Sequence, residues 1–275
     1  MDPEIKQKRK SERYSLLYVD TAHETSILHP SNPEQKKQLE KFTIRHFKTF
    51  RLTYWLLIAN YFLIVSVMLA FNATMTDFML TKYGYDYSEA KNFIGLNQIY
   101  QLFLFPTFGY ILQHYGRKSL FLTIGCFGFL TCFIILGSMP NNTHWTLYLI
   151  FFFISFSYSL IMPSIFPSLY LSLPQSALSV GLGIKEGITN LLMALFTYIN
   201  GRLSIKRTPE AFQDCINFWI IIAFFGFLVS LTLFVIDYRG LKLFYLKDDN
   251  KIVIDIQAKK NKEYEAISKE IMNRD

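Results

Sequence analysis

The sequence predicts an all-α membrane protein with six transmembrane helices. Of its 275 residues, 51% are hydrophobic and 18% are charged, whereas about a quarter of the residues in a typical soluble domain are charged. The charges gather near the two ends of the chain and in short connectors, so the segments between them are long and apolar. Each segment approaches the roughly 20 residues that cross a bilayer as a helix. No alternating pattern points to a membrane β-barrel.

The composition divides the chain into three regions. Residues 1–50 are polar, rich in Lys, Glu and Ser, and lack periodicity, so we expect a disordered cytosolic arm there. Residues 51–238 are expected to form the six-helix bundle, and residues 239–275 a charged cytosolic tail. The first residues are charged and no apolar core follows them, which argues against a signal peptide.

Each predicted span has its own boundaries. The first follows a basic cluster, and the second ends at the turn Gly116-Arg-Lys118, after which the third begins. The fourth is the longest and contains Pro163 and Pro167, the fifth carries Lys185 and Glu186, and the last leaves into a basic tail. The spans are residues 52–71, 93–112, 119–139, 145–173, 177–199 and 218–236.

Glycines are expected to permit close helix packing or a tight reversal of the chain, because they lack a Cβ atom. The pairs with this expected role are Gly109 and Gly116 around the basic turn, Gly125 and Gly128 in the third span, and Gly183 and Gly187 in the fifth.

Basic residues set the expected orientation, because cytosolic loops of membrane proteins collect Lys and Arg. An even number of spans places both tails on one side. Nine basic residues flank that side and five flank the other, although the cluster at Arg202–Arg207 runs against the rule. The nine are Lys41, Arg45, Lys48, Arg51, Arg117, Lys118, Arg239, Lys242 and Lys247, and the five are Lys82, Lys91, Arg202, Lys206 and Arg207.

Two short patterns concern the trafficking of the chain. Asn141-Asn-Thr143 predicts a glycosylation acceptor at Asn141 in a non-cytosolic connector. Glu12-Arg-Tyr-Ser-Leu16-Leu17 resembles the acidic dileucine signal that directs membrane proteins to endosomes and lysosomes. Such patterns also arise by chance, so the localisation is expected to be endolysosomal, with the plasma membrane as the alternative.

Several classes of function are disfavoured by the sequence. The net charge of +7 lies in the tails and turns, so no basic face for nucleic acid is expected. The three cysteines lie in or near apolar runs, which argues against a disulfide framework or a metal site. No nucleophile elbow, zinc-protease helix or phosphate loop is present, so we expect neither an enzyme nor a cofactor.

Amide side chains within the spans are the first candidates for contacts with a solute. They are Asn60 in the first span, Asn97 and Gln98 in the second, and Asn190 in the fifth. Polar groups in a membrane face the bundle interior or a water-filled cavity. Two interpretations therefore stand: the amides form hydrogen bonds between helices, or they line a path for a small solute.

Lys185 and Glu186 are the charged candidates, about 13 Å along the fifth span. Adjacent residues on a helix do not face each other, so we do not expect a simple ion pair between them. Lys185 is expected either to snorkel toward the cytosolic surface as an anchor or to act as a cation in a cavity. Glu186 is too short to snorkel and is expected to face the cavity, as a proton-coupling group or a counter-ion.

The stretch Pro106-Thr-Phe-Gly109, followed by Gly116-Arg-Lys118, resembles the helix-2-to-3 or helix-8-to-9 signature of the major facilitator superfamily. In that family the turn between the two helices acts as a gating motif, here Gly109, Gly116, Arg117 and Lys118. Gln113 stands where the family pattern usually has Asp, so the charge network of this turn is expected to be incomplete.

A second set of residues is similar to a lysosomal subgroup of that superfamily, the subgroup of major facilitator superfamily domain-containing protein 1. The set consists of Tyr158-Ser-Leu160, Pro167-Ser168, Pro174, Gly183 and Asn190. This resemblance implies that residues 48–240 correspond to the last six helices of a transporter.

Two functions are consistent with these features. The first is a half transporter that moves small organic solutes, short peptides among them, by alternating access with a second six-helix half or a homodimer partner. The second is a non-transporting membrane scaffold or partner subunit. In either case the partners are membrane lipid and other membrane helices, and in the first case also a small-molecule solute.

Overall fold

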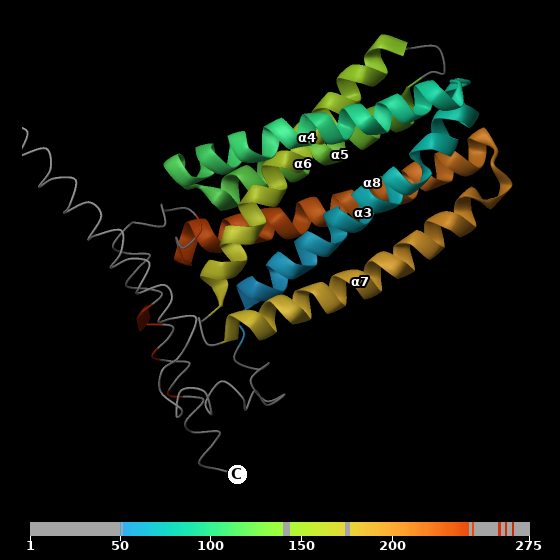
Figure 1. Ribbon diagram of the computed structural model, residues 1–275. Helices are drawn as coiled ribbons and strands as arrows, with labels where there is room; N and C mark the ends of the chain where they lie inside the picture. Colours follow the sequence, from blue (N-terminus) through green and yellow to red (C-terminus); the bar gives the residue numbers. More distant parts are fainter. Residues whose placement is uncertain are drawn as a thin grey trace, which may run out of the picture. The chain divides into compact units, whose positions relative to one another are not determined.

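The computed structural model describes residue 50, residues 52–139, 144–173 and 177–241, and the single residues 244, 258, 259, 262 and 266. Six α-helices run through these described residues (Figure 1). They are α3 (Leu52–Tyr83), α4 (Tyr87–Tyr115), α5 (Lys118–Ser138), α6 (His144–Ser172), α7 (Leu178–Leu203) and α8 (Pro209–Ile236). A 3-10 turn, η3 (Ser204–Lys206), precedes α8, and a π-helical turn, η4 (Asp237–Leu241), follows it.

Local sequence signals mark the helix boundaries. α8 begins with Thr208 as its N-cap, whose hydroxyl accepts a hydrogen bond from the Ala211 N–H at 3.3 Å, and Pro209 occupies the first helical position. At the start of α4, the Glu89 carboxylate accepts a hydrogen bond from the Asp86 N–H at 3.4 Å. Gly116, with φ +69°, turns the chain between α4 and α5, which confirms its predicted role in a tight reversal.

The predicted all-helical membrane bundle is confirmed, and most of the helices are longer than the apolar segments that predicted them. α3 continues twelve residues beyond the predicted end at residue 71, and α8 begins nine residues before the predicted start at residue 218. At about 1.5 Å per residue, α3 is about 48 Å long, whereas the hydrocarbon core of a bilayer is about 30 Å thick. Hydropathy marks the part of a helix that lies in lipid, and the helical hydrogen bonds continue past it.

Five of the described helices are long and apolar enough to cross a membrane, namely α3, α5, α6, α7 and α8. α4 is long enough as well, with 29 residues. Its apolar segment is interrupted by Asn97, Gln98 and Gln101. Two of these amides, Asn97 and Gln101, are buried against neighbouring helices, whereas Gln98 is exposed.

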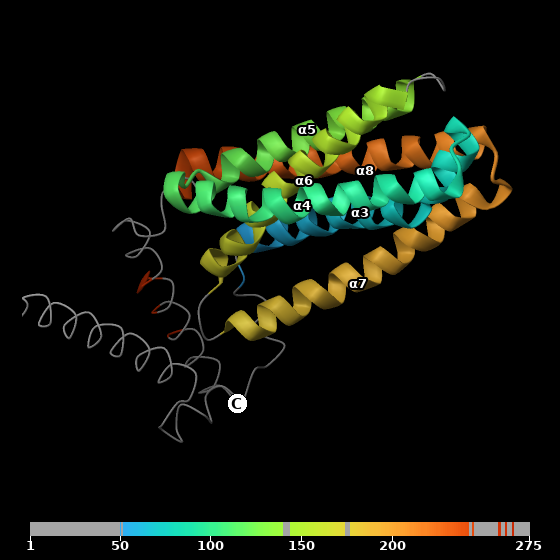
Figure 2. The same cartoon turned by 45° about the horizontal axis from the view of Figure 1, so that its top comes forward.

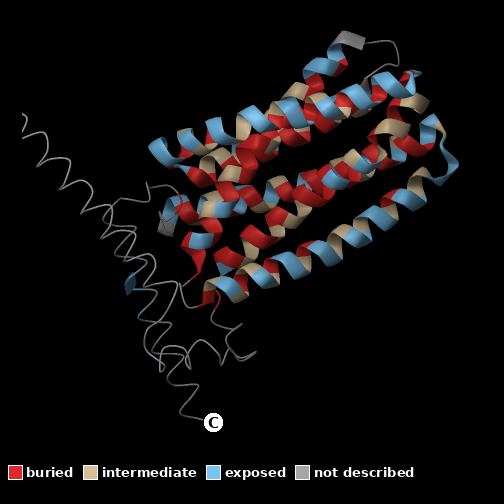
Figure 3. Ribbon diagram, viewed as in Figure 1, coloured by how far each residue is buried: buried red, intermediate tan, exposed pale blue. Residues whose placement is uncertain are grey.

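Short connections join successive helices, so that each runs opposite to the one before it. As a result, the first residue of α3 and the last of α8 lie at the same end of the bundle (Figures 1 and 2). α3 is the central helix and packs against α8, α7, α4 and α6, while α5 packs between α6 and α8. α7 is the most peripheral span, and its ribbon is mostly pale blue and tan in Figure 3.

An aromatic cluster forms the centre of the bundle around Phe71 of α3. The Phe71 ring meets Phe133 of α5 and Trp219 of α8 edge-on, with centroid distances of 5.4 and 5.3 Å, and stacks on Phe151 of α6 at 5.8 Å. Aromatic pairs of this kind contribute about 0.5–1.5 kcal/mol each beyond the area they bury. Four helices are thus held together by one side chain.

The predicted close packing at glycines is right for Gly125 and Gly128 and wrong for three other glycines. A Cβ atom on Gly125 would lie 2.7 Å from Ile161 Cγ1, and one on Gly128 would lie 2.6 Å from Ser157 Oγ, so both glycines permit the close approach of α5 and α6. A Cβ atom added to Gly109, Gly183 or Gly187 would meet no neighbouring helix within 4 Å among the described residues. The predicted packing role of these three glycines is therefore wrong for that part of the chain, because they lie on open faces of α4 and α7.

Candidate functional site

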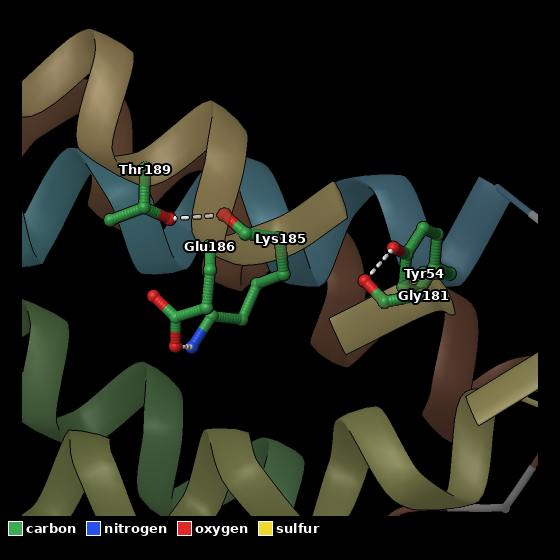
Figure 4. A network of polar contacts seen from close by, with 5 residues as sticks. All are labelled: Tyr54, Gly181, Lys185, Glu186 and Thr189. Atoms are coloured by element: carbon green, nitrogen blue, oxygen red, sulfur yellow. Dashed lines mark hydrogen bonds and ion pairs between the residues drawn. The ribbon is translucent and has the colours of Figure 1, made fainter. Parts of the chain in front are cut away.

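Lys185 is a buried cation held by three helices. Its residue is 1% exposed, and its Nζ atom lies 4.1 Å from the centroid of the Tyr61 ring of α3 and 5.0 Å from that of the Phe166 ring of α6. The two rings meet edge-on, 5.7 Å apart. The ammonium also lies 2.6 Å from Glu186 Oε1 (Figure 4). A desolvated cation over an aromatic face gains about 2 kcal/mol.

The expectation that this pair forms no ion pair is wrong, and one of the two alternatives for Lys185 is excluded. Lys185 and Glu186 do form an ion pair, although adjacent side chains leave a helix about 100° apart. The four-carbon stem of the lysine is long enough to turn its ammonium back toward the neighbouring carboxylate (Figure 4). The ammonium also lies between rings of α3 and α6, so Lys185 is not a snorkelling anchor.

The two side chains of the pair are covered to different extents by the rest of the bundle. The Lys185 side chain is 2% exposed, whereas the Glu186 side chain is 58% exposed. The buried cation is therefore fixed by packing, and its counter-ion stands at the edge of the buried face of α7. Phe166, which contacts the ammonium, is itself 39% exposed. An ion and an aromatic surface are thus accessible at the same place.

A hydrogen bond from α3 and a close approach of Leu173 position α7 beside this pair. The Tyr54 hydroxyl of α3 donates a hydrogen bond to the Gly181 carbonyl at 2.7 Å, one helical turn before Lys185. A Cβ atom on Gly181 would lie 2.3 Å from Leu173 Cδ1, so this position requires glycine unless Leu173 moves. One turn after Lys185, the Thr189 hydroxyl donates to the Lys185 carbonyl at 2.7 Å (Figure 4).

Asn97 is the centre of a separate polar network. Its side-chain NH₂ donates to Asn72 Oδ1 of α3 at 3.3 Å, and its own Oδ1 accepts from Gln101 Nε2 at 3.3 Å and from the Ser155 hydroxyl of α6. The residue is fully buried. Its amide thus bonds three helices to one another, in line with the interhelical interpretation.

The remaining predicted amides are scattered over the bundle. Asn60 is buried, and its NH₂ donates to the Gly226 carbonyl of α8 at 2.7 Å and approaches Cys126 Sγ of α5 at 3.6 Å. Asn60 therefore forms interhelical hydrogen bonds. Gln98 on α4 and Asn190 on α7 are exposed. Among the predicted solute contacts, the structure brings only Lys185 and Glu186 together.

The family model of the Major Facilitator Superfamily matches residues 14–197, which is more than half of the chain. The chain belongs to the major facilitator superfamily. No curated protein matches its sequence. Members of this superfamily are membrane transporters rather than enzymes, so the bundle is that of a multi-pass integral membrane protein from a transporter family.

The basic turn Gly116-Arg117-Lys118, which resembles a motif of the superfamily, lies at the end of the bundle where α8 ends. Gly116 and Arg117 both have positive φ, and α5 then begins at Lys118. The Ser119 hydroxyl donates to Asp237 Oδ2 at 2.8 Å, and the Lys118 N–H donates to the Phe244 carbonyl at 2.7 Å. The Phe244 N–H in turn donates to Asp237 Oδ1 at 2.9 Å.

Asp237 was not singled out from the sequence, although it is buried at this turn. The only signal was its place as the first charged residue after the last apolar span. It supplies a carboxylate at the turn from the end of α8, whereas the family pattern places one on the preceding helix at the position of Gln113. Tyr61 and Phe166 were also missed, because aromatic residues are abundant in every span.

Four of the predicted site residues lie outside the described residues, as do Pro174 and the basic residues Lys41, Arg45, Lys48, Arg51, Lys242 and Lys247. The four are the sorting residues Glu12, Leu16 and Leu17 and the glycosylation acceptor Asn141.

Proposed function

We propose that this chain provides six helices of a carrier that moves small organic solutes, short peptides among them, by alternating access. Membership of a transporter superfamily supports the reaction class. The other six helices would come from a second half or from a second copy of this chain, because carriers of this type rock two bundles around a site between them.

The observation that carries the proposal is the buried Lys185 ammonium, with its exposed counter-ion Glu186. Ionisable groups within a membrane are rare, and a protein keeps them where they serve a solute or ion pathway. Lys185 is buried against Tyr61 and Phe166, and Glu186 and Phe166 stand at the accessible edge of the same cluster. This edge is our candidate for the chain's share of the substrate site.

The test is uptake by proteoliposomes that contain the purified full chain. A mixture of dipeptides and free amino acids is offered, and the solutes retained in the vesicles are identified by mass spectrometry. We expect Glu186→Gln to reduce uptake at least tenfold, because no counter-ion can then return to the Lys185 ammonium and release the solute. The exposed carboxylate variant Glu210→Gln is expected to transport normally. Normal uptake by Glu186→Gln would contradict the assignment of the site.

We further propose an endosomal or lysosomal location, on the basis of Glu12, Leu16 and Leu17 and the resemblance to a lysosomal subgroup. Replacing both leucines with Ala is expected to move the protein to the plasma membrane, as seen by surface labelling. An unchanged distribution would remove the dileucine as the cause.

A non-transporting partner subunit is the second candidate function. The observation in its favour is that Asn60 and Asn97 are buried and form hydrogen bonds between helices, as expected for a packing element. This candidate predicts that the chain co-purifies with another carrier and that its own vesicles accumulate no solute.

A further inference from the structure

We infer that Glu186 is an exchangeable counter-ion of the Lys185 ammonium. The solute carries a carboxylate, which replaces the Glu186 carboxylate beside this ammonium. The inference rests on the proposed transport function and names the chemical class of its substrate: a small carboxylic acid with an apolar body.

The first argument is that Lys185 is packed more tightly than Glu186. The Lys185 ammonium is packed against Tyr61 and Phe166, at 4.1 and 5.0 Å from the ring centroids, and is buried. Glu186 is held only at its end, and 58% of its side chain is exposed. When Glu186 turns away, the rings keep the cation in place and the position of the carboxylate becomes open to another anion.

The second argument is the incomplete contact between the pair. An ammonium has three donors, and one carboxylate oxygen of Glu186 receives one of them, at 2.6 Å. The adjacent positions on α7 force this one-oxygen approach, because the two side chains diverge by about 100° at the helix surface. A free carboxylate has no such tether and can present both oxygens to the ammonium.

The third argument is the apolar surface beside the charge. Phe166 borders the ammonium and remains 39% exposed, so a ring surface is available next to the position that Glu186 would vacate. A solute with an apolar body attached to its carboxylate matches both features. A purely cationic solute would meet the buried ammonium and be repelled.

The experiment compares three probes that share one body and differ in the head group: phenylacetate, phenylacetamide and phenethylamine. Binding to the purified full chain in lipid nanodiscs is measured by saturation-transfer NMR and by the shift in melting temperature. We expect phenylacetate to bind at least tenfold more tightly than phenylacetamide, and phenethylamine to show no specific binding.

Variants separate an exchangeable counter-ion from a structural ion pair. A tethered carboxylate competes at an effective concentration of about millimolar or more, so Glu186→Gln is expected to raise the affinity for phenylacetate about tenfold. Lys185→Met is expected to abolish binding. Lys91→Met is the matched control, because Lys91 also lies over an aromatic ring, that of Tyr87 at 4.3 Å, but its residue is exposed.

Equal binding of phenylacetamide and phenylacetate would overturn the inference, and so would weaker or unchanged phenylacetate binding in Glu186→Gln. Because Lys185→Met can fail to fold, the Glu186→Gln result decides by itself. The proposed function fails separately. If the chain binds carboxylates but its vesicles take up no solute, the inferred carboxylate site stands and the proposed transport function fails. If the vesicles take up solutes whether or not they carry a carboxylate, the transport function stands and the inferred site fails.

Discussion

At the scale of single residues, the buried polar groups of this bundle differ in the partners they contact. Asn97 and Asn60 use their hydrogen-bonding capacity on neighbouring helices. Lys185 keeps its charge in contact with an exposed partner. The difference follows from position, because the two asparagines face other helices closely, whereas Lys185 lies on the peripheral helix α7 with an accessible edge beside it. The candidate site is therefore defined by charge and not by the amides.

Replacing Asn97 with Ala is expected to destabilise the bundle. The change leaves Asn72, Gln101 and Ser155 without their shared partner. Interhelical hydrogen bonds in membranes contribute about 0.6 kcal/mol on average and at most about 2, and loss of a shared hub approaches the upper value. The melting temperature of the purified protein measures the effect. Gln98→Ala, at the exposed neighbouring position, is the control and is expected to leave the melting temperature unchanged.

The sequence predicted the kinds of residue in the candidate site better than their geometry. Charged and amide residues within apolar spans are rare, so Lys185, Glu186 and Asn97 could be identified without coordinates. Their partners could not. Tyr61 and Phe166 are two of many aromatic residues, and only the packing of α3 and α6 against α7 brings their rings to the ammonium. The ion pair itself was missed because the length of the lysine stem overrides the divergence of adjacent positions.

At the scale of helices, the packing of α5 against α6 depends on glycine, whereas a Cβ atom added to Gly183 or Gly187 of α7 would meet no neighbouring helix within 4 Å among the described residues. α5 and α6 approach so closely at Gly125 that an added methyl group would lie 2.7 Å from Ile161 Cγ1 and 3.0 Å from the Ser157 carbonyl oxygen. On α7, Gly183 faces open space. Spacing along the sequence could not distinguish these cases, because it does not reveal which face of a helix meets a neighbour.

Gly125→Ala and Gly183→Ala are expected to have opposite effects. Overpacking at Gly125 costs about 1–3 kcal/mol, because the backbone oxygen of Ser157 cannot move aside as a side chain can. At Gly183 the same change relieves the poor helix propensity of glycine and stabilises α7 by up to about 1 kcal/mol. Melting in detergent measures both. A Gly183→Ala protein as destabilised as Gly125→Ala would show that α7 packs against a partner there.

The basic turn between α4 and α5 is connected to the end of α8 through Asp237. Asp237→Asn removes the charge that accepts from the Ser119 hydroxyl and the Phe244 N–H, and hydrogen bonds to charged groups contribute about 1.5–3 kcal/mol. We expect the Phe244 amide, whose N–H donates to Asp237, to exchange at least tenfold faster with deuterium. Asp77→Asn is the control, because the Asp77–Arg207 pair is exposed and 3.9 Å long and such pairs contribute little.

At the scale of the whole bundle, the fold follows from the sequence more completely than the site does. Six apolar segments separated by short turns fix an up-and-down arrangement, because each helix must satisfy its own backbone hydrogen bonds in lipid. Which helix becomes central could not be predicted. α3 is surrounded by four others, but its sequence does not mark it out, because a membrane span is apolar both on its buried faces and on faces that meet lipid.

The arrangement of the six helices makes a prediction about orientation in the membrane. The start of α3 and the end of α8 share one end of the bundle, together with the turn at Arg117 and Lys118 (Figure 1). Basic residues favour the cytosolic side, so we expect both tails in the cytosol and Asn141 on the opposite side. Epitope tags at residues 1 and 275 should be accessible once the plasma membrane alone is permeabilised, while the endolysosomal membrane stays intact. A glycan at Asn141, lost in Asn141→Gln, would mark the other face. Tags found on opposite sides would mean that one helix, with α4 the least apolar of them, does not cross the bilayer.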